Sequence, residues 1–111
     1  MKAAGPWAWR RVRAVADIDV TSQRVSNGWL CRVTIAEGGS ESTHTVAIRD
    51  EDLDRLAAGA TDPTDLVRRS FAFLLEREPK EAILRSFDLP IIGRFFPEYE
   101  ATIRQPASRE D

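Results

Sequence analysis

Several residue types and patterns that mark whole classes of protein are scarce or missing in this chain of 111 residues. Cys31 is the single cysteine, so no disulfide can form within one chain. His44 is the single histidine, and one His with one Cys cannot supply the three or four ligands that zinc needs. We therefore predict no metal site and no cofactor.

Long apolar runs are also missing. No stretch approaches the roughly 18 apolar residues that cross a bilayer. The N-terminal sequence lacks the apolar segment of a secretory signal peptide. With the lone cysteine, these features predict a cytoplasmic protein without a membrane partner.

The proportions of apolar and charged residues are those of an ordinary folded domain. Hydrophobic residues make up 42% and charged residues 31% of the chain, which differs from a disordered composition. The formal net charge of −2 excludes a polycation that binds nucleic acid over its whole surface. We predict a basic, Trp-containing leader at residues 1–14, a single α+β domain at 15–104 and a polar tail at 105–111.

The first half of the domain alternates apolar and polar residues, which is the pattern of half-buried strands. Strands are predicted over residues 16–25, 29–36 and 43–49. Asn27-Gly28 and Gly38-Gly39 lie between them, and both pairs tolerate the positive φ of tight hairpin turns. The pattern therefore predicts a three-stranded antiparallel meander.

The two turns fix which residues of the meander face each other. A turn at Gly38-Gly39 sets three inward-facing pairs: Val33 with His44, Cys31 with Val46 and Trp29 with Ile48. A turn at Asn27-Gly28 sets Val20 opposite Ile35. These pairs place apolar side chains on one face of the sheet. The other face is expected to carry Leu30, Arg32, Thr34, Thr43 and Thr45.

The second half of the domain has the periodicity of helices. Asp50 is expected to cap a short helix that buries Leu53 and Leu56 and ends at Gly59. Asp62 is expected to cap the next helix, with Pro63 at its first position. At helical spacing its buried side chains would cover an arc of about 200°: Leu66, Val67, Ser70, Phe71, Phe73, Leu74 and Leu75. So wide an arc predicts a helix that is central, covered on two sides, or partly in a subunit interface.

Prolines divide the rest of the chain. Pro79 is expected to start a helix over residues 80–87. Its inward-facing residues would be Ala82, Ile83, Leu84 and Phe87. Asp88 is expected to cap a last short helix that Pro97 stops, followed by a tail anchored by Tyr99 and Ile103. The fold class is thus α+β, with the meander packed on C-terminal helices.

Catalytic chemistry has little support in the sequence. His44 and Cys31 could form a nucleophile–base pair, but no third group or substrate cleft is indicated. A cross-strand neighbour and a small buried hydrophobe explain the two residues better. The carboxylates lie at predicted helix starts or beside basic residues, where they need no catalytic role. We predict no catalytic residues.

Two segments suggest nucleic-acid binding. Residues 80–96 resemble a helix-turn-helix, but the second helix is short and apolar with Arg94 as its only strong donor, so packing is favoured over reading of bases. The leader combines aromatic and basic residues without an acid, which suits single strands: Trp7, Trp9, Arg10, Arg11 and Arg13. A flexible leader or an added edge strand are the alternatives for it.

The run "FLLEREPKEAILRSFDL" (residues 73–89), followed by "FFPEYE", resembles a family of small bacterial proteins of uncharacterised function. The likeness covers about residues 28–104 and leaves out residues 1–14. No activity is attached to that family, so the resemblance implies no functional residue.

Three functions follow in order. The first is a non-enzymatic protein that acts by protein–protein association as a homo-oligomer, because the wide apolar arc and an open sheet edge both need cover. The second is a nucleic-acid-associated regulator that uses the leader. The third and weakest is a small enzyme.

Overall fold

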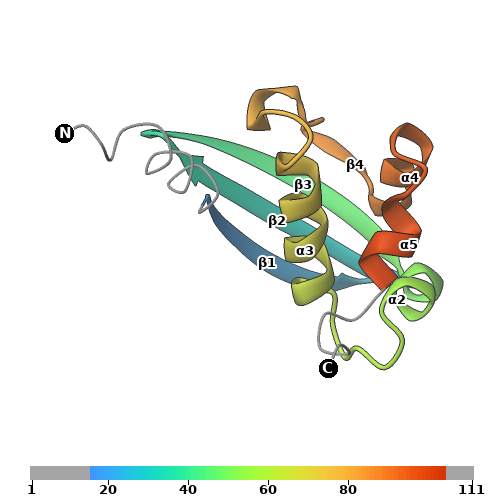
Figure 1. The fold of residues 1–111 in the computed structure, drawn as a ribbon. Coiled ribbons are helices and arrows are strands. Elements are labelled where there is room, and N and C mark those ends of the chain that lie inside the picture. The colour runs from blue at the N-terminus through green and yellow to red at the C-terminus, as the bar shows by residue number, and fades with distance from the viewer. Residues whose placement is uncertain (1–15, 105–111) are drawn as a thin grey trace, which may run out of the picture.

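A computed structural model describes residues 16–104. In it, the chain forms one sheet packed against helices. Three long strands come first: β1 (Asp17–Val25), β2 (Gly28–Glu37) and β3 (Ser40–Arg49). They pair antiparallel with their chain neighbours, and a short β4 (Ser86–Asp88) adds in parallel beside β3, giving the order β1-β2-β3-β4. The predicted α+β class and the three-stranded meander are confirmed (Figure 1).

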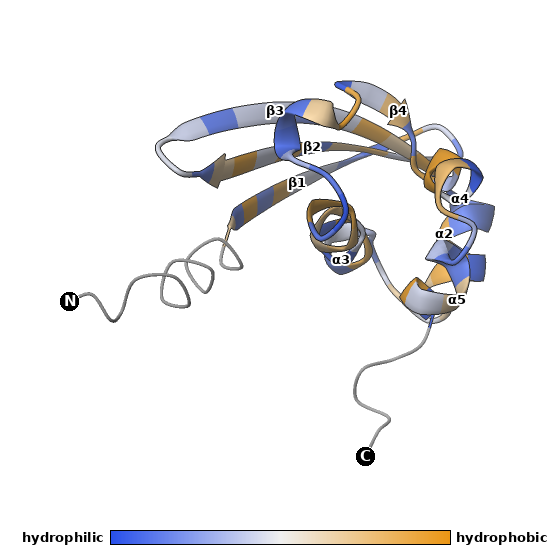
Figure 2. Ribbon diagram, turned by 45° about the horizontal axis from the view of Figure 1, so that its top comes forward, coloured by the Kyte–Doolittle hydropathy of each residue, from blue (hydrophilic) through white to orange (hydrophobic). Residues whose placement is uncertain are grey.

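The helices occupy one face and one end of this sheet. They are α2 (Asp50–Leu56), α3 (Thr64–Leu75), α4 (Ile92–Phe95) and α5 (Tyr99–Arg104), with 3₁₀ turns at Lys80–Ala82 and Leu89–Ile91. The sheet arches over α3, while α2, α4 and α5 gather at one end (Figure 2). Within residues 16–104, no helix has the length and apolar character that crossing a bilayer requires.

The register of the second hairpin is confirmed, whereas that of the first was wrong by two residues. Val25 pairs with Gly28, so the turn is Ser26-Asn27 and Val20 faces Val33 rather than Ile35. Asn27 supplies the left-handed backbone of the turn, with φ 62°. A Cβ on Gly28 would lie 2.4 Å from the carbonyl oxygen of Ile48, so this glycine admits the close approach of β3 and is not part of the turn. A shift of two residues keeps every side chain on its predicted face.

Helix α3 is the central element of the core. Leu66, Val67 and Phe71 are 0–1% exposed. They belong to the apolar cluster that fills the space between α3 and the inner face of the sheet. On its other side the ring of Phe73 meets that of Tyr99 edge-on at 5.3 Å between centroids. The predicted wide apolar arc is confirmed, and cover on two sides within one chain accounts for it.

A buried hydroxyl pair joins α3 to α5. Ser70 donates its hydroxyl to the carbonyl of Leu66 at 2.8 Å, and its oxygen lies 2.7 Å from the hydroxyl of Tyr99. Tyr99 is fully buried, and this burial raises the pKa of its phenol to about 12. The expected anchors Tyr99 and Ile103 are both buried, but they lie on a helix rather than on a tail.

The predicted helix over residues 80–87 was wrong. Only Lys80–Ala82 form a 3₁₀ turn, after which the chain is extended and pairs with β3 as β4. The backbone N–H of Thr45 donates to the carbonyl of Arg85 at 2.7 Å and so holds the chain just before β4 against β3. Ile83 is buried, whereas Ala82 and Leu84 face solvent. The sheet edge thus overrides the local helical preference of this segment.

The starts of α2 and α3 fall within one residue of their predicted positions. The cap residue of α2 is Arg49 rather than Asp50, and that of α3 is Pro63 rather than Asp62. Asp62 nevertheless accepts the backbone N–H of Thr64 at 2.8 Å, and this bond lowers the pKa of its carboxyl. It therefore satisfies one of the free N–H groups of the first turn of α3.

Candidate interaction surfaces

The basic segment of the leader lies outside the described residues. Trp7, Trp9, Arg10, Arg11 and Arg13 all precede residue 16, where the described part of the chain begins. Nucleic-acid binding by these residues therefore stays a prediction.

His44 is part of the core rather than of a cleft. It is 1% exposed and stacks at a tilt on Phe71, with 5.4 Å between ring centroids. Its Nδ1 lies 2.8 Å from the carbonyl oxygen of Leu84, which only accepts, so Nδ1 carries the proton. Nε2 lies 2.8 Å from the hydroxyl of Ser42. Both ring nitrogens are thus occupied, and the imidazole fastens the segment before β4 to β3.

Cys31 has different neighbours. It is 1% exposed, and its Sγ lies 3.5 Å from the hydroxyl of Ser22. That hydroxyl is also 2.9 Å from the hydroxyl of Thr64. Burial raises the pKa of the Cys31 thiol, which disfavours the thiolate that a nucleophile requires. Within residues 16–104, no group of three or more His, Cys, Asp and Glu is placed to hold a metal ion.

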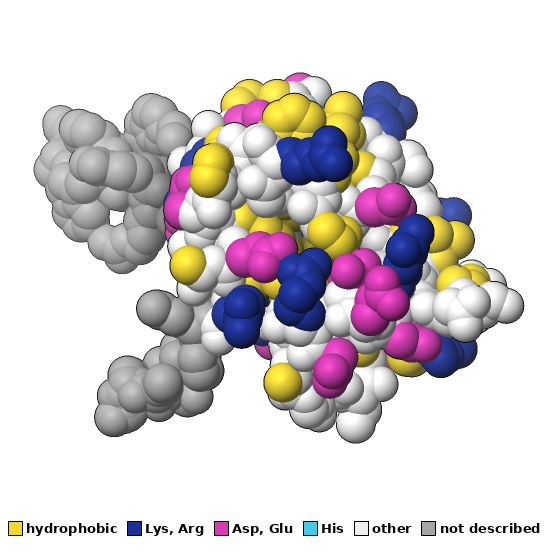
Figure 3. All heavy atoms as spheres, turned by 90° about the vertical axis from the view of Figure 1, so that its right-hand side faces the viewer, with side chains coloured by type: hydrophobic (Ala, Val, Ile, Leu, Met, Phe, Trp, Pro, Cys, Tyr) yellow, Lys and Arg dark blue, Asp and Glu magenta, His cyan; other side chains and the backbone are white. Residues whose placement is uncertain are grey.

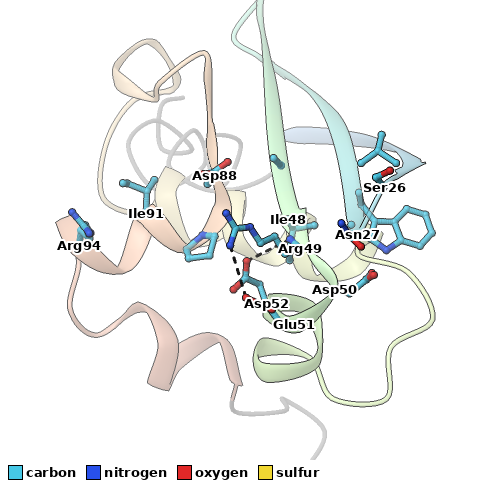
Figure 4. A pocket seen from close by; sticks show the side chains of 15 residues that line it. Ser26, Asn27, Ile48, Arg49, Asp50, Glu51, Asp52, Asp88, Ile91 and Arg94 are labelled. Carbon is cyan, nitrogen blue, oxygen red and sulfur yellow. Dashed lines mark hydrogen bonds and ion pairs between the residues drawn. The ribbon is translucent and has the colours of Figure 1, made fainter.

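A large hollow in the described surface lies where the first hairpin turn, α2 and α4 meet (Figure 4). Its volume is about 980 Å³, and it is broad and open. Arg49 reaches toward Glu51, with 3.9 Å between their charged atoms, while Arg94 lies on the opposite rim beyond Asp88. The backbone N–H of Arg49 donates to Asp52 at 3.4 Å.

The charges of this hollow are largely used within the chain. Asp50 accepts from both terminal nitrogens of Arg24, and this pairing lowers the pKa of its carboxyl. The acids stand in the first turn of α2, where the helix dipole favours them, as the sequence predicted. Such exposed pairs explain the cluster without a bound ligand.

An apolar groove lies at the far side of β4. The end of α3, the turn after it, β4 and α4 contribute side chains to a groove of about 410 Å³, among them Leu74, Glu78, Leu84, Phe87, Phe95 and Phe96. Leu84 is 52% and Phe95 65% exposed, the two largest values for big apolar side chains in residues 16–104. On the face formed by the helices at this end of the sheet, hydrophobic side chains gather in one part and mixed charges cover the rest (Figure 3).

The outer edge of β1 is the second exposed feature. β1 is nine residues long and ends the sheet, with no strand beside it among residues 16–104. In a two-residue hairpin the flanking pair exchanges hydrogen bonds, so the odd-numbered residues of β1 bond to β2. The even-numbered residues, from Ile18 to Arg24, turn their backbone groups outward. The carbonyl of Ile18 accepts from Arg68 at 3.4 Å, which agrees with this geometry.

No family model, curated protein or solved structure matches the chain. The resemblance of residues 28–104 to a bacterial family therefore stays a prediction.

Sequence reasoning found the open sheet edge and missed the groove. The groove depends on β4 and on the segment before it, whereas residues 80–87 were predicted as one helix with Leu84 inward. The pattern "EPKEAILRSF" carries helix-forming residues, and nothing in it signals the parallel pairing with β3.

Proposed function

We propose that this protein is a non-enzymatic homodimer that associates through the edge of β1. The observation that carries the proposal is the row of outward backbone groups along β1, beside which residues 16–104 place no other strand. Unpaired strand edges recruit other strands unless charge, proline or a bulge protects them. No proline or bulge interrupts β1, and its charged residues Asp17, Asp19 and Arg24 lie toward its two ends.

The charges of β1 favour an antiparallel pairing with a second copy. Asp17 and Asp19 lie at one end of the strand. Two-fold pairing about Thr21 sets Asp17 opposite the partner's Val25 and Asp19 opposite the partner's Gln23. No like charges then face each other, and the outward-turned groups of the even-numbered residues meet their counterparts. Two sheets become one continuous sheet.

Size-exclusion chromatography with light scattering at micromolar concentration tests the proposal, with a dimer as the expected result. Thr21→Asp places two carboxylates opposite each other at the two-fold axis and should raise the dissociation constant about tenfold or more. Inside one chain, Arg32 lies opposite Thr21 on β2 and can pair with the new acid, so folding should persist.

Thr43→Asp is the matched control, because Thr43 lies on the same face of the sheet but on β3. It should remain dimeric. A monomeric wild-type protein would refute the proposal, as would equal dissociation of both variants.

A further inference from the structure

The apolar groove lies at the edge of the sheet opposite to β1. The strand order is β1-β2-β3-β4 (Figure 1), and the groove is lined in part by Phe87 of β4, the strand farthest from β1. Pairing along β1 therefore leaves the groove of each chain open. The dimer partner then does not cover Leu84 and Phe95.

The walls of the groove favour recognition through side chains. They are built from the end of α3, the chain between α3 and β4 that includes Leu84, the single residue Phe87 of β4, and the 3₁₀ turn and α4 that follow. An extended peptide gains affinity from a long strand edge, and β4 has only three residues. A helix that inserts large apolar side chains spaced one turn apart suits such a groove better. The volume of about 410 Å³ lies in the range of binding clefts.

One charge distinguishes this groove from a plain apolar patch. Glu78 is the only charged residue that lines it, and it is half-buried. Its basic neighbours are engaged elsewhere, since Arg77 pairs with Glu98 at 3.1 Å and Lys80 with Glu81 at 2.8 Å. Within residues 16–104 no ion pair involves Glu78. A carboxylate in an apolar wall attracts a cation on the occupant.

We propose that the groove binds an amphipathic helix of a partner protein, with large apolar side chains in the groove and a Lys or Arg against Glu78. If the chain is the dimer proposed above, it presents two such grooves and links two copies of the partner. Only this bivalence rests on the proposed function, because each groove is complete within one chain.

Two labelled synthetic helical peptides are the probes. Both carry Leu and Phe one turn apart, and they differ only in a flanking Lys or Glu. Fluorescence anisotropy should show saturable binding of the Lys peptide, at least about fivefold tighter than that of the Glu peptide. Glu78→Gln should remove the difference between the peptides. Leu84→Ser should weaken both by about tenfold.

Leu30→Ser is the matched control, since Leu30 is also exposed, at 40%, but lies on the sheet. It should bind both peptides as the wild type does. Equal binding of the two peptides, no saturable binding, or an equal loss in Leu30→Ser would overturn the proposal. So would dissociation of a wild-type dimer by Leu84→Ser, because a second copy would then fill the groove.

The Thr21→Asp variant separates the two proposals. As a monomer it should bind free Lys peptide with the same dissociation constant per chain. On a surface coated densely with peptide it should dissociate faster than the wild-type dimer, because it lacks the second groove. If the wild type is itself monomeric yet binds the peptide, the dimer fails and the groove stands.

Discussion

The strands of residues 17–49 pair with their neighbours in the chain through two tight hairpins, whereas the segments of residues 79–104 are held by residues far away in sequence. His44 bonds Leu84 across 40 positions and Ser70 meets Tyr99 across 29. Arg55 similarly reaches Glu100 across 45 positions. The short elements of this region have three to six residues each, too few to be stable alone.

This difference indicates that the C-terminal segments depend on the meander and α3 for their conformation. The meander needs α3 to cover its apolar face, but its pairing is already specified by alternation and turns. The C-terminal segments take their conformation from the sheet and α3, so they should loosen first when a tie is cut. Substitutions at the long-range contacts therefore test whether the C-terminal segments loosen before the meander does.

The largest effect is expected at Phe71, where the two halves meet. Its ring lies between those of His44 and Phe87, at 5.4 and 6.0 Å between centroids. Phe71→Ala leaves a cavity and should lower the free energy of unfolding by about 3–5 kcal/mol, measured by urea denaturation. Phe95→Ala is the control, because its exposed ring should change stability by less than about 0.5 kcal/mol. Similar losses in both variants would contradict the assignment of Phe71 to the core.

Tyr99 should make stability fall at alkaline pH. Its pKa is about 12 in the folded chain and 10 in the unfolded reference, so folding favours the protonated phenol. The contribution is complete below pH 10 and is lost as pH rises toward 12, amounting to about 3 kcal/mol. Denaturation at pH 9 and 11.5 measures it, and Tyr99→Phe should remove this part of the loss.

Absorbance provides an independent check, because Tyr99 is the single tyrosine of the chain. Phenolate absorbance in the folded protein should appear well above pH 10. A midpoint near 10 in folded protein would show that the phenol is not buried as described.

A smaller and more local effect is expected at His44. His44→Phe keeps an aromatic ring beside Phe71 but leaves the carbonyl of Leu84 without its donor, at a cost of about 1–3 kcal/mol. Hydrogen exchange should show reduced protection of residues 83–88 and little change in the β1–β2 hairpin. Uniform loss of protection in both regions would argue that the halves unfold as one unit.

The smallest effect is expected at the first turn. Asn27 has φ 62°, and Asn27→Ala places a residue there that tolerates this conformation poorly, for about 1 kcal/mol. Thermal unfolding measures the shift, and Asn27→Gly should be close to wild type because glycine adopts this φ without strain. Equal melting temperatures for the Ala and Gly variants would count against strain at this turn.

The same comparison explains how far the sequence could predict the fold. Alternation assigned the faces of all three strands. The first turn was misplaced by two residues, and an even shift leaves every side chain on its predicted face. The cause of that error was Gly28, whose role is the close approach of β3, a contact invisible before the strands are assembled.

Predictability ends where long-range contacts decide the structure. Residues 83–88 carry helical preference, but Ser86–Asp88 pair with the edge of β3 as a strand. The groove could not be predicted for the same reason, since its walls come from four segments that only the fold brings together. The open edge of β1 could be predicted because position in a meander alone determines it.

The burial of the single thiol in β2 has a practical consequence. A reagent that modifies cysteine cannot reach Cys31 while β2 remains covered by α3. The rate at which such a reagent modifies Cys31 therefore measures how often the core opens. The rate of Cys31 modification thus reports how often the domain opens. Any condition or binding partner that lowers this rate stabilises the closed form.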